Sequence, residues 1–298
     1  MSHLIGLDIG GTKIAGGLLS PQGAMLSQRQ VPTPKDYADF LDVCRDMALA
    51  LEREAGTQAR VGVGIAGRID RERGCVSSAN LSFLTGKPLL HDLEAKLGRN
   101  IRLANDANCA ALAEATDGAG ASCTSVLGLI MGTGVGAGFV YQGKIMDGFN
   151  GVASEIGHLP LPHREEPDGP LAPCSCNQQG CIDKTISGGG LARLYEAMTG
   201  KAADAKQIAA LSNGGDADAL RVLDRFYDVV AKAMVVILHT FDPEIIVVSG
   251  GLNALPGLYD EVPKRWGRYC CVAQPKTKFV PARLGATAGL WGAAWLWR

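Results

Sequence analysis

The chain has 298 residues, enough for a large hydrophobic core, and this length favours two lobes. Its formal net charge is −1 and no basic run stands out, so the electrostatic signature of a nucleic-acid-binding protein is absent. No apolar stretch is long enough to cross a bilayer, and the N-terminus lacks the basic start and apolar run of an export signal. We therefore expect a cytoplasmic protein that binds neither membrane nor nucleic acid.

The first stretch that suggests chemistry is residues 4–13, LIGLDIGGTK. An apolar strand carries Asp8 and leads into a turn, which consists of Gly10, Gly11, Thr12 and Lys13. Glycines let backbone N–H groups approach an anion closely, and a carboxylate can hold the Mg²⁺ that accompanies a nucleotide. No helix start signal follows, so the turn is predicted to be a β-hairpin and not a Walker loop or a dinucleotide fingerprint. An ordinary glycine hairpin without a ligand is the alternative.

Helices and strands are predicted to alternate through the next hundred residues. Asp36 can cap a helix that runs to about Ala55, and residues 61–65, 91–97 and 101–103 are predicted as strand, helix and strand. The last strand leads into Asn105, Asp106 and an alanine-rich helix over residues 107–115. Asp106 can be interpreted in two ways. In one interpretation it caps that helix, and in the other the end of the strand directs its side chain into a cleft, where it acts as a general base.

The second half of the chain echoes the first. An apolar strand over 127–131 is followed by a glycine-rich run over 132–138 and a second strand over 139–141. An offset of 122 residues places Gly10 on Gly132, as a duplicated lobe would. The echo puts Ile130 opposite Asp8, so the turn does not need that carboxylate, which favours a functional role for Asp8. Two such hairpins at a cleft suit the phosphates of a nucleotide.

Three of the nine cysteines are close in sequence, Cys174, Cys176 and Cys181. A full disulfide framework is not expected in a chain of this kind. Three thiolates and one imidazole form the closed tetrahedral set of a structural zinc site, and His158 and His163 both compete for the fourth position. Such a site has no direct role in catalysis and would fix the loop that carries Glu155. Buried or oxidised thiols are the alternative.

The C-terminal third is predicted to be mainly helical. A helix over 191–198 follows the break at residues 187–190, two helices cover 204–239 with Leu220 on their apolar face, and a terminal helix covers 285–297. A buried strand over 244–248 ends in Gly250, Gly251 and Leu252, where an α/β fold leaves room for a flat ligand such as adenine. An unliganded helix–strand turn is the alternative. The terminal helix has an apolar stripe that we assign to the core, and we expect the adjacent pair Cys270 and Cys271 to be buried.

Six motifs in this order resemble the ROK family (repressors, open reading frames, sugar kinases), and the resemblance spans nearly the whole chain. They are residues 8–13, 103–108, 132–136, 155–158, 174–181 and 249–252. The resemblance implies an α/β, actin-like, hexokinase-type two-lobed fold of duplicated RNase H-like domains. It also implies ATP with Mg²⁺, a sugar between the lobes, a structural Zn²⁺ site and a homodimer. We place residues 1–120, joined by the helix 285–298, in a small N-terminal lobe. Residues 121–284 form a large C-terminal lobe with the zinc knuckle.

The resemblance also implies a role for each matching residue. Asp106 is the expected general base. The expected sugar contacts are Gly67, Asn80, Asn105, Asp106, Glu155, His158 and Asp183. The expected zinc ligands are His158, Cys174, Cys176 and Cys181. The expected nucleotide-side residues are Asp8, Gly10, Gly11, Thr12, Lys13, Gly132, Thr133, Gly134, Gly136, Gly250, Gly251 and Leu252.

The expected reaction is ATP-dependent phosphorylation of a hexose at the 6-hydroxyl. Residues 86–89 and 155–158 resemble kinases of N-acetylglucosamine, which we favour, whereas 103–109 and 292–297 resemble the fructokinase and mannokinase branch, and a glucokinase is a further alternative. A sugar-responsive regulator would need a DNA-binding domain ahead of the first hairpin, for which Leu4 leaves no room. A sugar-binding protein without catalysis is a third class, and Asp8 and Asp106 argue against it.

Three positions depart from the family pattern. Asp183 stands where a glutamate is usual and is one methylene shorter, which affects its reach to the sugar. Asn177 replaces a common glycine in the cysteine knuckle, and Gly285-Ala286 replaces a usual Gly-Asp.

Overall fold

The computed structural model describes residues 2–70, 72–78 and 80–298. The chain divides into two compact units. The first contains Met1–Gly118, Gly138–Ala153 and Ala286–Arg298, and the second contains Ala119–Ala137 and Ser154–Gly285. The segment 138–153 groups with the first unit, whereas the sequence-based division placed it in the second. Within the described ranges, no helix combines the length and apolar character needed to cross a membrane.

The first unit is built on a five-stranded mixed sheet in the order β3-β2-β1-β4-β7. Its strands are β1 (Leu4–Ile9), β2 (Lys13–Leu19), β3 (Met25–Pro32), β4 (Arg60–Ile65) and β7 (Arg102–Asn105). Strand β1 pairs antiparallel with β2 and parallel with β4, so Asp8 lies opposite both Ala15 and Gly64. The predicted hairpin is confirmed, because β1 and β2 meet at a turn closed by a 3.0 Å hydrogen bond from Gly10 N to Lys13 O.

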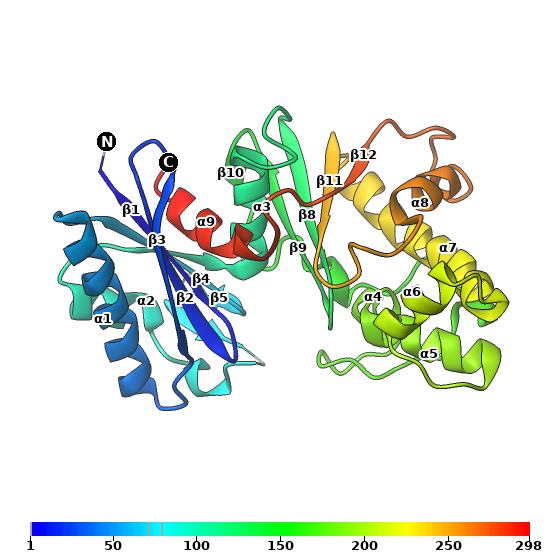
Figure 1. The fold of residues 1–298 in the computed structure, drawn as a ribbon, viewed down its shortest axis with the longest axis horizontal. Helices are drawn as coiled ribbons and strands as arrows, with labels where there is room; N and C mark the ends of the chain where they lie inside the picture. The colour runs from blue at the N-terminus through cyan, green and yellow to red at the C-terminus, as the bar shows by residue number, and fades with distance from the viewer. Residues whose placement is uncertain (1, 71, 79) are drawn as a thin grey trace. The chain divides into compact units, whose positions relative to one another are not determined.

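The two faces of this sheet are packed in different ways. Alternate residues of β1 point to opposite faces, and Ile5 belongs to the core cluster shared with helices α1 (Tyr37–Ala55) and α2 (Leu89–Leu97). On the other face, a methyl group on Gly6 or Gly62 would collide with the backbone of helix α9 (Ala288–Trp295). The glycines therefore let α9 lie directly against the strands, and Figure 1 shows α1 and α9 on opposite sides of this sheet.

The first unit also contains short strands, a short helical turn and helix α3. They are β5 (Arg68–Asp70), β6 (Cys75–Ser77), η1 (Ser82–Leu84), α3 (Asp106–Thr116) and β10 (Lys144–Ile145). Helix α3 packs tightly on α9, since a Cβ on Gly292 would collide with the carbonyl oxygen of Cys109. The predicted cap of α1 is confirmed, because the carboxylate of Asp36 accepts hydrogen bonds from the amides of Ala38 and Asp39. The predicted stripe on the terminal helix comprises Leu290, Trp291, Ala294 and Trp295, of which Leu290, Ala294 and Trp295 are buried in the core and Trp291 is half-buried.

A second five-stranded sheet has the order β10-β9-β8-β11-β12. Its other strands are β8 (Ser125–Met131), β9 (Val135–Tyr141), β11 (Ile245–Ser249) and β12 (Lys278–Pro281), and the chain passes from the second unit into the first within β9. The order repeats that of the first sheet: a hairpin with a third antiparallel strand on one side and two parallel strands on the other. The internal echo in the sequence thus corresponds to a repeated strand order.

Helices make up most of the regular secondary structure of the second unit. They are η2 (Ile156–His158), η3 (Glu166–Asp168), α4 (Ile182–Thr185), α5 (Gly188–Thr199), α6 (Ala205–Asn213), α7 (Ala217–Thr240) and α8 (Leu258–Trp266), and the chain returns to the first unit within η4 (Gly285–Thr287). The predicted apolar face of α7 is buried from Leu223 to Ile237, but the assignment of Leu220 to that face is wrong, because its side chain is 49% exposed.

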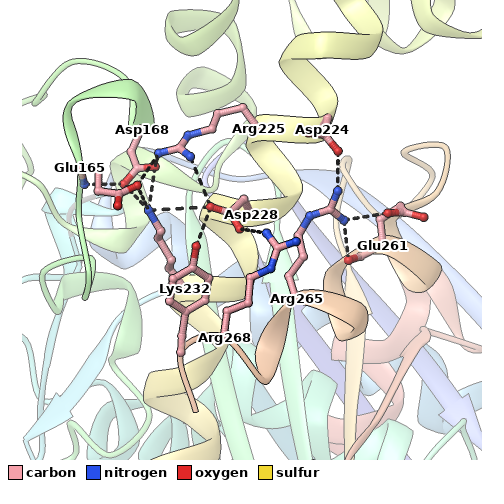
Figure 2. A network of polar contacts seen from close by, with 10 residues as sticks. Glu165, Asp168, Asp224, Arg225, Asp228, Lys232, Glu261, Arg265 and Arg268 are labelled. Carbon is pink, nitrogen blue, oxygen red and sulfur yellow. Dashed lines mark hydrogen bonds and ion pairs between the residues drawn. The ribbon is translucent and has the colours of Figure 1, made fainter. Parts of the chain in front are cut away.

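A network of charges fixes the loop before the cysteine cluster onto α7. Lys232 is fully buried, and its Nζ lies 3.0 Å from Asp168 and 3.1 Å from Glu165. Arg225 pairs with the same two carboxylates, and Figure 2 shows Asp228 between Arg225, Lys232 and Arg268. Removing one partner of a buried ion pair typically costs about 3–5 kcal/mol. The network therefore holds the 165–168 segment against α7 and constrains the chain that leads to the cluster.

Candidate functional site

Asp8 lies on the face of the first sheet that is covered by α9. It is two residues before Gly10, where the glycine hairpin begins. A Cβ on Gly289, near the start of α9, would lie 2.9 Å from Asp8 Oδ2. Burial, and then the negative charge of Asp106, raise the pKa of Asp8 to about 6, while Lys13 acts in the opposite direction. A buried carboxylate whose pKa is raised further by a second negative charge belongs to a site that favours a cation.

Asp106 is the first residue of α3, directly after strand β7. The helix cap is its neighbour Asn105, whose Oδ1 accepts hydrogen bonds from the amides of Ala107 at 2.9 Å and Asn108 at 3.2 Å. Asp106 Oδ1 also accepts from Ala107 N at 3.0 Å. Burial raises the pKa of Asp106, against the opposing effect of its hydrogen bonds. Asn105 supplies the cap, so the first interpretation of Asp106 is not needed to explain the helix start.

Two further positions expected on the sugar side lie in the same unit. Asn105 Nδ2 donates a 3.0 Å hydrogen bond to Gly67 O, which brings Gly67 next to the β7–α3 junction. Asn80 lies beside the first hairpin, because a Cβ on Gly11 would be 3.7 Å from Asn80 Cβ. The structure thus groups Gly67 with Asn105 and places Asn80 at the glycine turn.

The first hairpin is braced by residues that the sequence analysis missed. Thr33 Oγ1 donates to Gly10 O at 2.7 Å, and Lys35 Nζ donates to Gly11 O at 3.0 Å. Both residues follow β3, an edge strand that is mostly exposed on both faces, so no apolar alternation signalled it. Without β3, nothing in the sequence could place Thr33 and Lys35 at the turn.

Three glycine-rich segments meet in the second unit. Leu252 N donates to Met131 O at 2.9 Å, and Gly188 N donates to Gly132 O at 2.8 Å. A Cβ on Gly250, which has φ +88°, would lie 2.5 Å from Met131 O, so only glycine fits there. The hairpin after β8, the turn after β11 and the start of α5 therefore lie together.

The start of α5 adds a feature suited to anions. Ser187 caps the helix by accepting a hydrogen bond from Gly190 N, and helix N-termini present free N–H groups to phosphates. A hollow of about 420 Å³ runs beside it between α5 and α6, lined by Gly189, Arg193 and Gln207 among others. This part of the second unit has room for a ligand next to the glycine turns.

Asp183, on α4, points at the second hairpin. Its Oδ1 accepts a 2.8 Å hydrogen bond from Val135 N, and its Oδ2 lies 2.8 Å from Lys184 Nζ. A Cβ on Gly134 would lie 2.5 Å from Asp183 Oδ1, so the glycine makes this approach possible. The family resemblance predicts a sugar contact for this residue, whereas its contact with the hairpin backbone had no signal in the sequence.

The structure brings together the predicted metal ligands His158, Cys174, Cys176 and Cys181, whose ligand atoms all lie within 4.8 Å of one another. Cys174 Sγ is 3.5 Å from His158 Nδ1, and Cys176 Sγ is 3.6 Å from Cys181 Sγ. His163, the competing fourth ligand, stacks instead on Tyr269 with ring centroids 5.5 Å apart. One nitrogen and three sulfurs match the donor set of a structural zinc site.

Two details support this arrangement of the cluster. Asn177 has φ +65°, a left-handed conformation that glycine adopts freely and asparagine tolerates better than most residues, which explains the departure from glycine. His158 Nε2 lies 3.9 Å from Glu155 Oε2, while Nδ1 lies on the side of the thiols. A group held by the cluster would therefore fix both the ring of His158 and the loop of Glu155.

The expectation that Cys270 and Cys271 are buried is wrong. Cys270 is half-buried and Cys271 is exposed, both in the loop after α8. Helix α8 was itself missed, because Pro263 interrupts the helical pattern in the sequence.

The chain is similar to known proteins over nearly its whole length. The profile of the ROK family matches residues 4–298. N-acetyl-D-glucosamine kinase of Vibrio cholerae is 39% identical over 297 residues, covering 98% of both chains. A ROK hexokinase from Thermus thermophilus is 35% identical with a TM-score of 0.86, covering 98% of this chain and 97% of that one. A ROK glucokinase from Streptomyces griseus, solved with glucose and AMPPNP, is 30% identical with a TM-score of 0.76, covering 99% and 98%.

These matches extend over nearly the full length of the chain and of its relatives. The resemblance carried by the six ordered motifs is therefore confirmed, together with the α/β, hexokinase-type fold with mixed sheets. The chain belongs to the ROK family.

Proposed function

We propose that this chain is an ATP-dependent kinase that phosphorylates N-acetyl-D-glucosamine at its 6-hydroxyl. The observation that carries the proposal is the pair Asp8 and Asp106, two carboxylates with raised pKa in one unit of a chain that is 39% identical to an N-acetyl-D-glucosamine kinase. Phosphorylation of glucose, mannose or fructose is the alternative within the family. A regulator or a non-catalytic binder has no use for this acidic pair.

Each residue group has a role in the proposed reaction. Phosphoryl transfer requires mainly positioning and neutralisation of charge. The N–H groups at residues 10–13, 132–136 and 250–252 orient phosphate oxygens, and Asp8 holds Mg²⁺ through water. Asp106 accepts the proton of the sugar hydroxyl, and its raised pKa brings the base closer to the working pH. The hollow beside α5 is where we place the nucleoside of ATP.

The sugar contacts that we propose in the first unit are Asn105, Gly67 and Asn80, and those that we propose in the second unit are Glu155 and His158. Structural Zn²⁺, held by His158 and the three clustered cysteines, would fix the loop of Glu155 and supply no reaction chemistry. A cytoplasmic location and a homodimer stay predictions. We include the cytoplasmic location in the proposal because the phosphoryl donor is ATP.

The reaction itself is tested with ATP and a panel of N-acetylglucosamine, glucose, mannose and fructose. We expect sugar-dependent ADP release with the highest kcat/KM for N-acetylglucosamine. A preference for another hexose would move the chain to the alternative branch. If no sugar in the panel increased ATP consumption, the kinase proposal would fail.

Asp106→Asn tests the general base. A positioned base typically contributes about 10²- to 10⁴-fold in rate, so kcat should fall by that factor while calorimetry still detects sugar binding. Asp117→Asn is the matched control, since Asp117 lies at the opposite end of the same helix, and its kcat should stay near the wild-type value. A near-normal kcat in Asp106→Asn would remove Asp106 from its role.

Elemental analysis tests the zinc cluster. Protein purified without added metal should contain about one zinc per chain, because four ligands make a closed, tightly binding site. Cys176→Ser should lose the metal and expose the 159–181 loop to proteolysis, whereas Cys123→Ser, which changes a half-buried thiol elsewhere, should do neither. An active enzyme without zinc would reduce the cluster to packed thiols.

The role of Asp183 is tested by two substitutions, one that removes the side-chain oxygen acceptor and one that keeps it. Asp183→Ala leaves Val135 N–H without its acceptor, a loss of about 1–3 kcal/mol, so KM for ATP should rise about tenfold. Asp183→Asn retains an Oδ1 acceptor and should change KM for ATP much less. If both variants instead raise only KM for the sugar, the carboxylate acts on the sugar and not on the hairpin.

A further inference from the structure

A second group of metal-binding side chains lies in the second unit, apart from the cysteine knuckle. His239, Cys270 and Cys271 each offer a ligand atom, and these atoms lie within 4.8 Å of one another. His239 and Cys271 are exposed and Cys270 is half-buried. None of the three has a role in the proposed phosphoryl transfer. We propose that they form a second metal site, for a thiol-seeking divalent cation of the zinc class.

The backbone holds the three side chains in place. His239 is in the last turn of α7, and the two cysteines follow α8, where Cys270 N donates to Trp266 O at 2.9 Å. The loop is closed tightly, since a Cβ on Gly267 would collide with Ala273 O. The site is therefore largely formed before any ligand arrives, which reduces the entropy cost of binding.

The imidazole of His239 is already in the form that a metal requires. Cys271 N donates a 3.1 Å hydrogen bond to His239 Nε2. A backbone amide can only donate, so Nε2 carries the lone pair and any ring proton is on Nδ1. The lone pair thus faces the segment that carries both thiols, and a bound cation would replace the amide hydrogen as its partner.

The residue before the pair anchors the same loop. Tyr269 OH donates a 2.8 Å hydrogen bond to Asp228 Oδ2, and the ring of Tyr269 stacks on His163. Asp228 belongs to the charge network of Figure 2, which is fixed on α7 as is His239. The loop and the histidine therefore share one rigid support.

The donor set determines which cation fits. Hard cations such as Mg²⁺ and Ca²⁺ prefer oxygen ligands, whereas two thiolates and an imidazole suit zinc. Three protein ligands leave a fourth position open to water or an exogenous ligand, unlike the closed set of the knuckle. Because the thiols must lose their protons, affinity should rise with pH. Exposure of His239 and Cys271 makes the metal exchangeable with solvent.

Equilibrium dialysis of the zinc-loaded protein against ZnCl₂ tests the site. The wild type should bind a second equivalent, weaker than the first and tighter at pH 8 than at pH 6, in about the range where thiols ionise. The double variant Cys270→Ser and Cys271→Ser should bind one equivalent only, and Cys123→Ser should behave as the wild type. His239→Ala should weaken the second equivalent by at least about tenfold.

Two controls separate this site from the knuckle and from misfolding. Cys176→Ser should lose the tight equivalent and keep the weaker one, and thermal unfolding without added zinc should be unchanged in the double variant. A wild type that binds one equivalent at every zinc concentration would overturn the proposal. A second equivalent that survives the double substitution would do so as well, because other residues would then hold it.

Discussion

The close approach of α9 to the glycine face of the first sheet is the constraint on which the first unit depends. Without side chains at Gly6 and Gly62, the helix backbone lies directly on β1 and β4, and Gly292 lets α3 pack on its other side. Asp8 comes from the sheet and Asp106 from α3, and α3 itself reaches the sheet beside Asp8, because a Cβ on Gly64 would lie 3.1 Å from Cys109 Sγ. Burial under α9, and then the negative charge of Asp106, raise the pKa of Asp8.

In the second unit, backbone hydrogen bonds around one turn hold the glycine-rich segments together. Met131 O and Gly132 O accept from Leu252 N and Gly188 N, and Asp183 accepts from Val135 N. Asp183 lies two residues after Cys181, so the cysteine cluster and the glycine hairpin are joined by a short rigid segment. Loss of order in the cluster would therefore be transmitted to the hairpin as well as to the loop of Glu155.

The sequence predicts those features whose cause is local. The hairpins, the cap at Asp36 and the helix that follows it come from apolar runs, turn residues and capping chemistry, and the structure confirms them. Features with a distant cause were missed or wrong. Strand β3 has little buried surface, α8 contains Pro263, and the contact of Asp183 with Val135 joins residues 48 apart. Cys270 and Cys271 were predicted to be buried because cysteine is commonly a buried residue type. Their exposure depends on tertiary packing, which the sequence does not reveal.

The same thiol chemistry would have different consequences in the two proposed metal sites. In the knuckle, Cys174 and Cys181 are buried, and backbone hydrogen bonds from Cys174 N to Gln178 O and from Asn177 N to Cys174 O hold the turn, so water and competing ligands have little access. At the end of α7, a pair of cysteines open to solvent meets a single histidine. Burial and a complete ligand set favour permanent retention of a metal, whereas exposure and a missing fourth ligand favour exchange. With metal bound as proposed, the first group would therefore behave as part of the fold, and the second would respond to the metal content of its surroundings.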